Sequence, residues 1–182
     1  MSVSLARQIS IGLGAAIIFA SSPAFSAEQV VLKYRVLRES VSVSELTTFA
    51  NTGQASPDLQ TYFRLSRQNP EAVRQTLTRQ VSVNPVLLDR VLNSPLGNGI
   101  LDQLGQAIQT PRGGAERQAL RAALTLSASD DGKVSILEIL QKYPTQEVVV
   151  DGDRVEGTYR QLNQLAERLR NPLGNILSRI FR

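Results

Sequence analysis

The sequence predicts a mainly α (α+β) domain, in which a series of short capped helices packs as one unit with a small two- or three-stranded antiparallel sheet. Six of the eight prolines directly follow an Asn or a Ser, and five of these pairs lie after residue 26, where such a pair is typical of helix starts. Apolar residues after these pairs recur at spacings of three and four, which places them on one helical face. Alternating apolar residues near both ends of the helical region predict strands, and we expect one sheet to join those ends.

Residues 1–26 precede this domain and have the pattern of a secretory signal peptide. Arg7 supplies a basic start, residues 9–20 form an apolar run too short for a comfortable membrane span, and Ala24 and Ser26 are the small residues before a cleavage point. We therefore predict cleavage after Ser26 and export to the periplasm or another extracytoplasmic compartment. An uncleaved N-terminal anchor is the alternative interpretation.

The domain itself is predicted to cover residues 27–156 and to begin with a strand. Apolar residues at alternate positions define one face of that strand: Val30, Leu32, Tyr34 and Val36. We expect a polar turn at residues 38–40, followed by a short return strand with Val41 and Val43. Ser42 and Glu45 have the spacing of a capping box, which predicts that a short helix begins there.

Residues 53–110 are predicted to continue as helices, each turning sharply into the next. Gly53 ends the first helix, and an Asn-Pro or Ser-Pro pair opens each of the next four, at positions 56, 69, 84 and 94. Their predicted apolar faces contain Leu59, Tyr62, Phe63 and Leu65; Val73, Leu77 and Val81; Val86, Leu87, Val91 and Leu92; and Leu96, Ile100, Leu101, Leu104, Ala107 and Ile108. Residues 84–110 hold two of these starts in quick succession, and we expect them to form the centre of the core.

The remainder of the domain is predicted to contain two helices and a strand. Residues 115–126 return to helical spacing with Leu120, Ala123, Leu124 and Leu126. Ser135 and Glu138 form a second capping box, which opens a helix that stops before Pro144. Residues 146–150 are strand-like and precede a turn at residues 151–153.

Residues 127–138 lie in the register of a calcium-binding loop, with Asp131 before the turn glycine and Glu138 at the position of the bidentate ligand. Ser127 stands where such loops nearly always carry an aspartate. With so few carboxylates, Asp131 and Glu138 are weak candidates, and we favour a plain helix–turn–helix capped by Ser135. We predict no resident metal and no cofactor.

Residues 157–182 are predicted to form a basic amphipathic C-terminal helix. Apolar residues at helical spacing form its stripe, and arginines occupy the other faces: Tyr159, Leu162, Leu169, Leu173, Ile176 and Ile180, with Arg168 and Arg179. Three interpretations remain open, in which the stripe packs on the domain, binds a partner protein, or lies on an anionic membrane surface. We predict no nucleic-acid binding, because no aromatic residues interleave with the arginines.

Several kinds of catalytic site are excluded by composition. The chain has no histidine and no cysteine, so it cannot form a Ser-His-Asp or Cys-His constellation or a usual zinc site. It also lacks a G-x-S-x-G nucleophile elbow, a phosphate-binding glycine loop and a dinucleotide fingerprint. We therefore predict that this chain has no catalytic residues.

Four stretches of this sequence resemble a known family: residues 30–63, 84–111, 118–132 and 139–153. They are similar to the N-terminal domain of unknown function that precedes the catalytic domain in secreted cyanobacterial-type α/β-hydrolases. Their motifs are structural and not catalytic. The resemblance implies a stand-alone accessory module here, because the hydrolase domain does not follow and no histidine is present to serve as a base.

The sequence therefore predicts an exported, non-catalytic accessory or interaction module. Its partner would be a hydrolase, another envelope protein, or an anionic membrane surface contacted through the C-terminal stripe. Two other functions are open, a hydrolase-associated enzyme with weak esterase activity and a lipid-binding carrier with a cavity between the helices.

Overall fold

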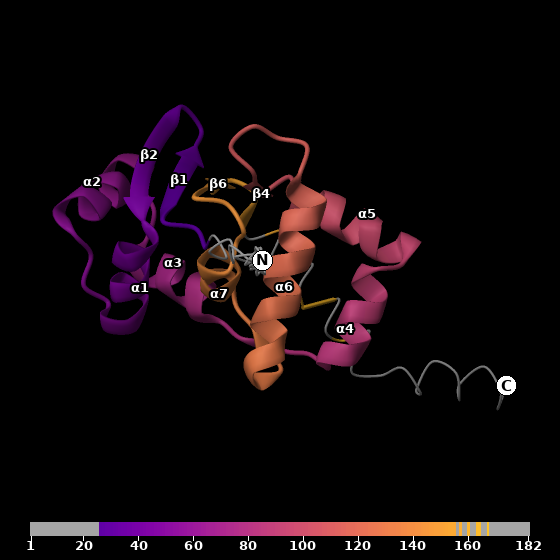
Figure 1. The fold of residues 1–182 in the computed structure, drawn as a ribbon. Helices are drawn as coiled ribbons and strands as arrows, with labels where there is room; N and C mark the ends of the chain where they lie inside the picture. The colour runs from indigo at the N-terminus through magenta and orange to yellow at the C-terminus, as the bar shows by residue number, and fades with distance from the viewer. Residues whose placement is uncertain (1–25, 156, 158–159, 161–162, 165–166, 168–182) are drawn as a thin grey trace, which may run out of the picture.

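The computed structural model describes residues 26–155, 157, 160, 163–164 and 167. The helices are α1 (Val43–Thr52), α2 (Pro57–Ser66), α3 (Pro70–Thr78), α4 (Pro85–Leu92), α5 (Pro95–Leu104), α6 (Glu116–Asp131) and α7 (Ile136–Gln141). The strands are β1 (Gln29–Tyr34), β2 (Leu37–Ser42), β3 (Val81–Ser82), β4 (Ile108–Gln109), β5 (Lys133–Val134) and β6 (Glu147–Asp151). The predicted α+β class is confirmed. Figure 1 shows α6 in the middle, with α4 and α5 on one side and α1, α2, α3 and the β1–β2 hairpin on the other.

The main sheet joins the two ends of this domain, as the strand-like ends of the sequence predicted. Its strand order is β2-β1-β6-β4. β1 and β6 pair in parallel, with Val30 opposite Val148 and Leu32 opposite Val150, whereas β2 and β4 pair antiparallel to their neighbours. The sheet is therefore mixed and has four strands, where a purely antiparallel sheet of two or three strands was expected.

The β1–β2 hairpin differs from the predicted turn. The chain reverses at Arg35 and Val36, and residues 38–40 belong to β2. Arg35 adopts a φ of 53°, and its N–H donates to Asp153 Oδ2 at 3.0 Å. Two-residue hairpins require such a left-handed conformation, which residues other than glycine adopt at an energetic cost. Val36, predicted on the apolar face, is consequently 97% exposed at the hairpin tip.

Six of the seven described helices begin with the predicted capping chemistry, and α6, which follows Ala115, begins without a side-chain cap. The side chains of six residues accept hydrogen bonds from first-turn N–H groups of α1, α2, α3, α4, α5 and α7: Ser42, Ser56, Asn69, Asn84, Ser94 and Ser135. Both capping boxes form, because Glu45 and Glu138 reach back to the N–H groups of Ser42 and Ser135. Gly53 ends α1 in the left-handed conformation, as expected.

The ends of several helices, and some of the residues assigned to apolar faces, were predicted wrongly. Val43 begins α1 instead of ending a strand, Val81 lies in β3, and Ile108 lies in β4, while α6 continues to Asp131. Four residues assigned to buried faces are exposed: Leu65, Val86, Leu96 and Leu126. Leu65, Leu96 and Leu126 each precede a buried residue, and Val86 precedes the half-buried Leu87. The buried face of each helix is therefore narrower than the apolar face that the sequence predicted.

The core is continuous across the domain. Residues 84–110 supply Leu88, Leu92, Leu101, Leu104 and Ile108, all among the largest fully buried side chains, so this stretch is indeed central. They pack with Leu120 and Leu124 of α6. On the other side of the domain, Phe49 and Phe63 stack with ring centroids 5.2 Å apart.

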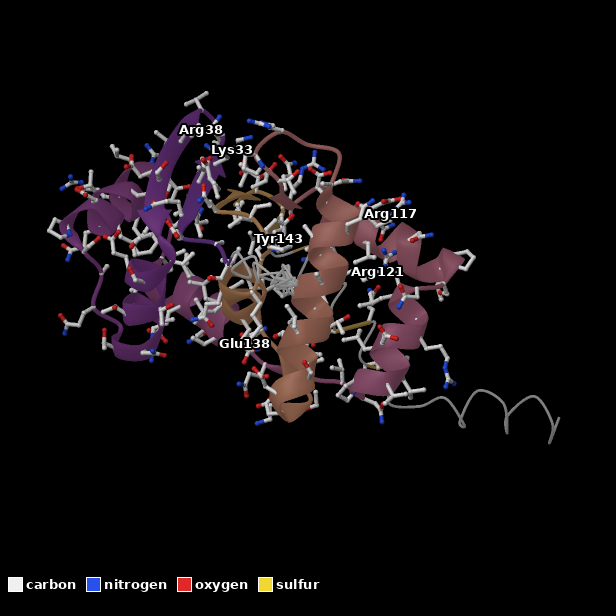
Figure 2. The ribbon with its side chains drawn as sticks, in the orientation of Figure 1. Lys33, Arg38, Arg117, Arg121, Glu138 and Tyr143 are labelled. Carbon is white, nitrogen blue, oxygen red and sulfur yellow. The ribbon has the colours of Figure 1, made fainter. Side chains whose placement is uncertain are left out.

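α4 and α5 are held tightly end to end. Arg121 of α6 donates from Nε to Leu92 O at 3.0 Å and from Nη2 to Asn98 Oδ1 at 2.9 Å, and thereby bridges the two helices. Figure 2 shows Arg121 pointing toward α4 and α5. Gly97 permits the close approach, because a Cβ there would lie 2.1 Å from Val91 O.

Two helix–loop–helix units are linked by the second, two-stranded sheet. The loop between α3 and α4 carries β3, and the loop between α6 and α7 carries β5. They pair antiparallel, with Val81 opposite Val134 and Ser82 opposite Lys133. Within the described part of the chain, no helix combines the length and apolar content needed to cross a membrane.

Candidate functional site

An apolar cleft lies where α2, α3 and α7 meet the main sheet. It has a volume of about 560 Å³. Side chains from five elements form its floor and walls: Leu32, Leu59, Phe63, Leu77, Leu140 and Val150. Most of these residues also belong to the core, so the cleft is an opening in the packed interior. Pockets of this size, predominantly apolar with a few polar groups, are typical of binding sites.

Helical spacing on α2 and the register of β1 with β6 place these side chains in the cleft. Leu59, Tyr62 and Phe63 have helical spacing and share one face of α2, which begins at the Ser56 cap. Leu32 and Val150 are opposite each other in the parallel β1–β6 register, so they present adjacent side chains on one face of the sheet. The cleft therefore depends on the sheet bringing the two ends of the domain together.

The rim of the cleft combines two tyrosines with charged groups. Tyr34, Tyr62, Arg79 and Asp153 all line it. Burial raises the pKa of Tyr62 to about 12, and the nearby charges of Asp153 and Glu39 act in the same direction. The Tyr62 hydroxyl therefore stays protonated near neutral pH. The guanidinium of Arg35 lies 5.5 Å from the centre of the Tyr34 ring, in a cation–π arrangement at the outer edge.

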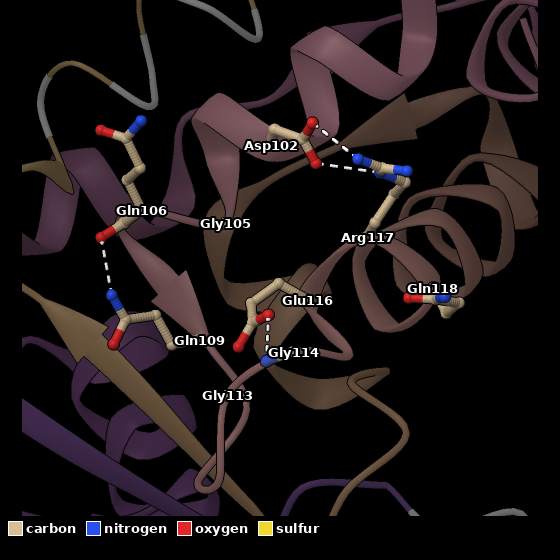
Figure 3. Close-up of a pocket in the computed structure, with 9 residues that line it drawn as sticks. All are labelled: Asp102, Gly105, Gln106, Gln109, Gly113, Gly114, Glu116, Arg117 and Gln118. Atoms are coloured by element: carbon tan, nitrogen blue, oxygen red, sulfur yellow. Dashed lines mark hydrogen bonds and ion pairs between the residues drawn. The ribbon is translucent and has the colours of Figure 1, made fainter. Parts of the chain in front are cut away.

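A second hollow, of about 570 Å³, lies between the end of α5 and the start of α6 (Figure 3). Arg117 binds Asp102 with both nitrogens, Nε–Oδ1 at 2.9 Å and Nη2–Oδ2 at 2.7 Å. This contact lowers the pKa of Asp102 and raises the pKa of Arg117. Since each charge satisfies the other, neither group is poised as an acid or a base.

Glu116 lines the same hollow and organises the loop before α6. Its carboxylate accepts hydrogen bonds from the N–H and hydroxyl of Thr110 and from the N–H of Gly114, the last at 2.7 Å (Figure 3). Burial by itself raises the pKa of Glu116, but these hydrogen bonds outweigh it and the net effect lowers the pKa. The carboxylate is thus held ionised in a structural role.

The calcium-loop candidates Asp131 and Glu138 form hydrogen bonds with different partners. Glu138 Oε2 accepts from Ser135 N at 2.8 Å and from the Ser127 hydroxyl at 3.1 Å. Asp131 Oδ1 accepts from Lys133 N at 2.9 Å, and its other oxygen lies 3.8 Å from Lys133 Nζ. Among the residues with described positions, no three His, Cys, Asp or Glu side chains are grouped to hold a metal ion.

Hydroxyl groups with a carboxylate neighbour are the closest approach to catalytic geometry. Ser127 is 2% exposed, and its hydroxyl donates a hydrogen bond to the Glu138 carboxylate. The same carboxylate oxygen also accepts from the Ser135 N–H. Tyr143 is fully buried near the centre of the molecule (Figure 2), and burial raises the pKa of its hydroxyl. A substrate would have to open the core to reach either group.

The residues predicted to contact a partner or a membrane lie outside the described part of the chain: Tyr159, Leu162, Leu169, Leu173, Ile176, Ile180, Arg168 and Arg179. The predicted signal peptide, apart from Ser26, lies outside it as well. A cavity between the helices was named only as part of the lipid-carrier alternative, and the residues that line the cleft were not predicted as a site. Leu59, Tyr62 and Phe63 were placed correctly on one helical face, but their convergence with β1 and α3 depends on topology.

A family model described as "Alpha/beta hydrolase of unknown function (DUF1400)" matches residues 26–151. Neither a curated protein sequence nor a solved structure matches this chain. The matched residues are the ones that form the α+β domain with its mixed four-stranded sheet. Since the match covers well over half of the sequence, the chain belongs to the DUF1400 family of α/β-hydrolases of unknown function.

Proposed function

We propose that this chain is an exported, non-catalytic accessory module, equivalent to the N-terminal domain that precedes the catalytic domain in longer secreted relatives. One observation carries the proposal: within residues 26–151, which the family model matches, the carboxylates of Glu45, Glu116 and Glu138 are occupied in capping helices or fixing a loop. The whole chain also contains no histidine to serve as a general base.

Carboxylates that already hold hydrogen bonds or ion pairs support a structural role for this domain. Glu45 and Glu138 complete capping boxes, Glu116 holds the loop before α6, and Asp102 is paired with Arg117. Catalytic acids and bases are commonly found with pKa values moved toward neutrality in open clefts. Here the pKa values of Glu45, Asp102 and Glu116 are lowered instead. Those carboxylates are suited to holding structure and not to exchanging protons near neutral pH.

Export is the part of the proposal that depends on residues 1–26. The basic start, apolar run and small residues before Ala27 support it. Cell fractionation followed by N-terminal sequencing tests it. We expect the protein outside the cytoplasm with Ala27 or the following residue at its N-terminus, and an intact Met1 in the cytoplasmic fraction would contradict export.

An accessory role requires a partner, and the family description makes an α/β-hydrolase domain the first partner to test. The C-terminal stripe beyond residue 170, with Leu173, Ile176 and Ile180, supplies apolar surface for that contact, or for an anionic membrane. The test adds the purified chain to the separate hydrolase domain of a longer relative and measures binding by calorimetry together with ester hydrolysis. Saturable binding or changed turnover is expected. Their absence, with neither anionic vesicles nor the hydrolase domain bound, would contradict the proposal.

A lipid-binding carrier is a second candidate function, favoured specifically by the apolar cleft. Its walls, including Leu59, Phe63 and Leu77, would accommodate an acyl chain. Native mass spectrometry of the purified chain tests this function. Co-purified lipid that is lost in Val73→Arg, which lines the cleft, and retained in Val86→Arg, which is exposed on α4, would favour the carrier.

A further inference from the structure

The apolar cleft opens at the point where the described domain ends. Val155 is the last residue of the continuous described segment, lines the cleft, and packs against the core. We propose that this cleft is the docking site of the chain's own segment 157–170, whose apolar stripe covers the openings between α2, α3 and the sheet.

The chain leaves the domain at a fixed position. Gly152 N donates to Lys33 O at 2.7 Å, and the Asp153 carboxylate accepts from Arg35 N at 3.0 Å. Arg154 N donates to Asp151 O at 3.0 Å, which closes the turn. The following segment is thereby tethered to the mouth of the cleft. Tethering through a short linker gives an effective local concentration on the order of millimolar, so free ligands must compete with the segment.

The segment has the pattern that a groove of this kind recognises. Tyr159, Leu162, Ala166 and Leu169 recur at spacings of three and four. An amphipathic helix places such residues in one row and inserts them into an apolar groove. Asn171-Pro172 interrupts the pattern, because proline disfavours helical backbone at the residue before it. The proposed occupant therefore ends at residue 170.

Charge does not select the occupant, and apolar contact does. Segment 157–170 contains Arg160, Arg168 and Arg170 against the single acid Glu167. The rim of the cleft is mixed in sign, with Asp153 on the hairpin side and Arg79 on the α3 side. The apolar stripe is therefore the part of the segment that an apolar groove recognises.

The absence of cysteine from the chain allows a direct test by cross-linking. Thr76 lines the cleft and is half-buried on α3, whereas Leu96 is exposed on α5 and remote from the cleft. The full chain is made as Thr76→Cys/Leu162→Cys and, as a matched control, Leu96→Cys/Leu162→Cys. Both are treated with a short bis-maleimide at low protein concentration.

We expect the Thr76 pair to cross-link within one molecule at least tenfold faster than the Leu96 pair. Adding Leu169→Asp should bring the Thr76 pair down to the control rate. Equal rates for the two pairs would overturn the proposal. Cross-linked dimers in place of the intramolecular product would identify a second copy of the chain as the occupant and would also overturn the proposal.

A second measurement leaves the folded domain unchanged in sequence. Leu162→Asp/Leu169→Asp alters only the segment, and hydrogen exchange is followed in α2 and α3. We expect exchange in α3 (Pro70–Thr78) to accelerate about tenfold relative to the unaltered chain, while α5 stays unchanged. Identical exchange in α3 would contradict docking, even if the cysteine variants failed to fold.

Discussion

Replacing Gly97 by alanine tests the end-to-end packing of α4 and α5 on which the centre of the core depends. An added Cβ would lie 2.1 Å from Val91 O, 2.7 Å from Leu92 Cα and 2.9 Å from Leu92 C. All three are backbone atoms, so no side chain can rotate away. Restoring ordinary contact requires α4 and α5 to separate by more than about 1 Å, which interiors packed to crystal density resist.

The expected loss of stability follows from two opposing effects. Overpacking of a well-packed site costs up to about 3 kcal/mol. Alanine is favoured over glycine in a helix by about 1 kcal/mol, which offsets part of that loss. We therefore expect Gly97→Ala to lower the free energy of unfolding by about 2 kcal/mol. Separation of the helices would also disturb the hydrogen bond from Arg121 to Leu92 O.

Gly99→Ala is the matched control in the same helix. No atom lies within 4 Å of a Cβ added there, so only the helix propensity changes. We expect a gain of about 0.5–1 kcal/mol. Urea unfolding at equilibrium measures both variants, with an unchanged m-value required for the comparison. Gly97→Ala within about 0.5 kcal/mol of the unaltered chain, the range of surface changes, would refute the reasoning.

Three further predictions concern the core, the loop carboxylate and the calcium-like loop. Leu101→Ala and Leu104→Ala remove side chains that are 0% and 1% exposed, and each should lower the free energy of unfolding by about 2–5 kcal/mol; losses below about 0.5 kcal/mol at both would remove this stretch from the centre of the core. Glu116 has a lowered pKa in the folded state, so its contribution to stability is present above its unfolded pKa and is lost as pH falls below it. The stability difference between the unaltered chain and Glu116→Gln should therefore shrink between about pH 6 and pH 3 in urea unfolding, and a constant difference would show that the carboxylate charge is not involved. Calorimetry at millimolar calcium should show no heat of binding, since Asp131 and Glu138 are committed to other partners, and saturable heat lost in Glu138→Gln would prove the loop functional.

Helix starts could be predicted from sequence because their chemistry is local. The side chains of Ser56 and Asn84 accept hydrogen bonds from N–H groups three residues further on. The proline that follows each of them loses no hydrogen bond, because an N–H at that position would have no partner within the helix. The same holds for the capping boxes at Ser42 and Ser135. Each cap involves only neighbours within one helical turn, so its sequence pattern contains the whole interaction.

The ends of α3 and α5 and the hairpin turn could not be predicted in the same way. Val81 and Ile108 continue a helical apolar pattern, but each pairs with a strand distant in sequence, Val134 and Val150. These tertiary contacts override the local pattern. The turn at Arg35 has neither glycine nor asparagine, and its left-handed backbone is supported by Asp153, more than a hundred residues further along the chain.

The candidate site illustrates the same limit. Helical spacing identifies Leu59 and Phe63 as one face, yet it does not show that the face meets Leu32 and Val150 across a cleft. The parallel pairing of β1 with β6, which sets that arrangement, joins residues from the two ends of the domain. Conversely, Asp131 and Glu138 fit a calcium-loop spacing, but their carboxylate oxygens accept hydrogen bonds from the N–H groups of Lys133 and Ser135.

The central claim is that this DUF1400 chain acts without catalysis of its own. The most direct measurement is ester hydrolysis by the purified full chain, using short- and medium-chain esters, beside a Ser127→Ala variant. We expect rates equal to the buffer blank for both proteins, because Ser127 is 2% exposed and the chain has no histidine. Turnover above the blank that disappears in Ser127→Ala would contradict it.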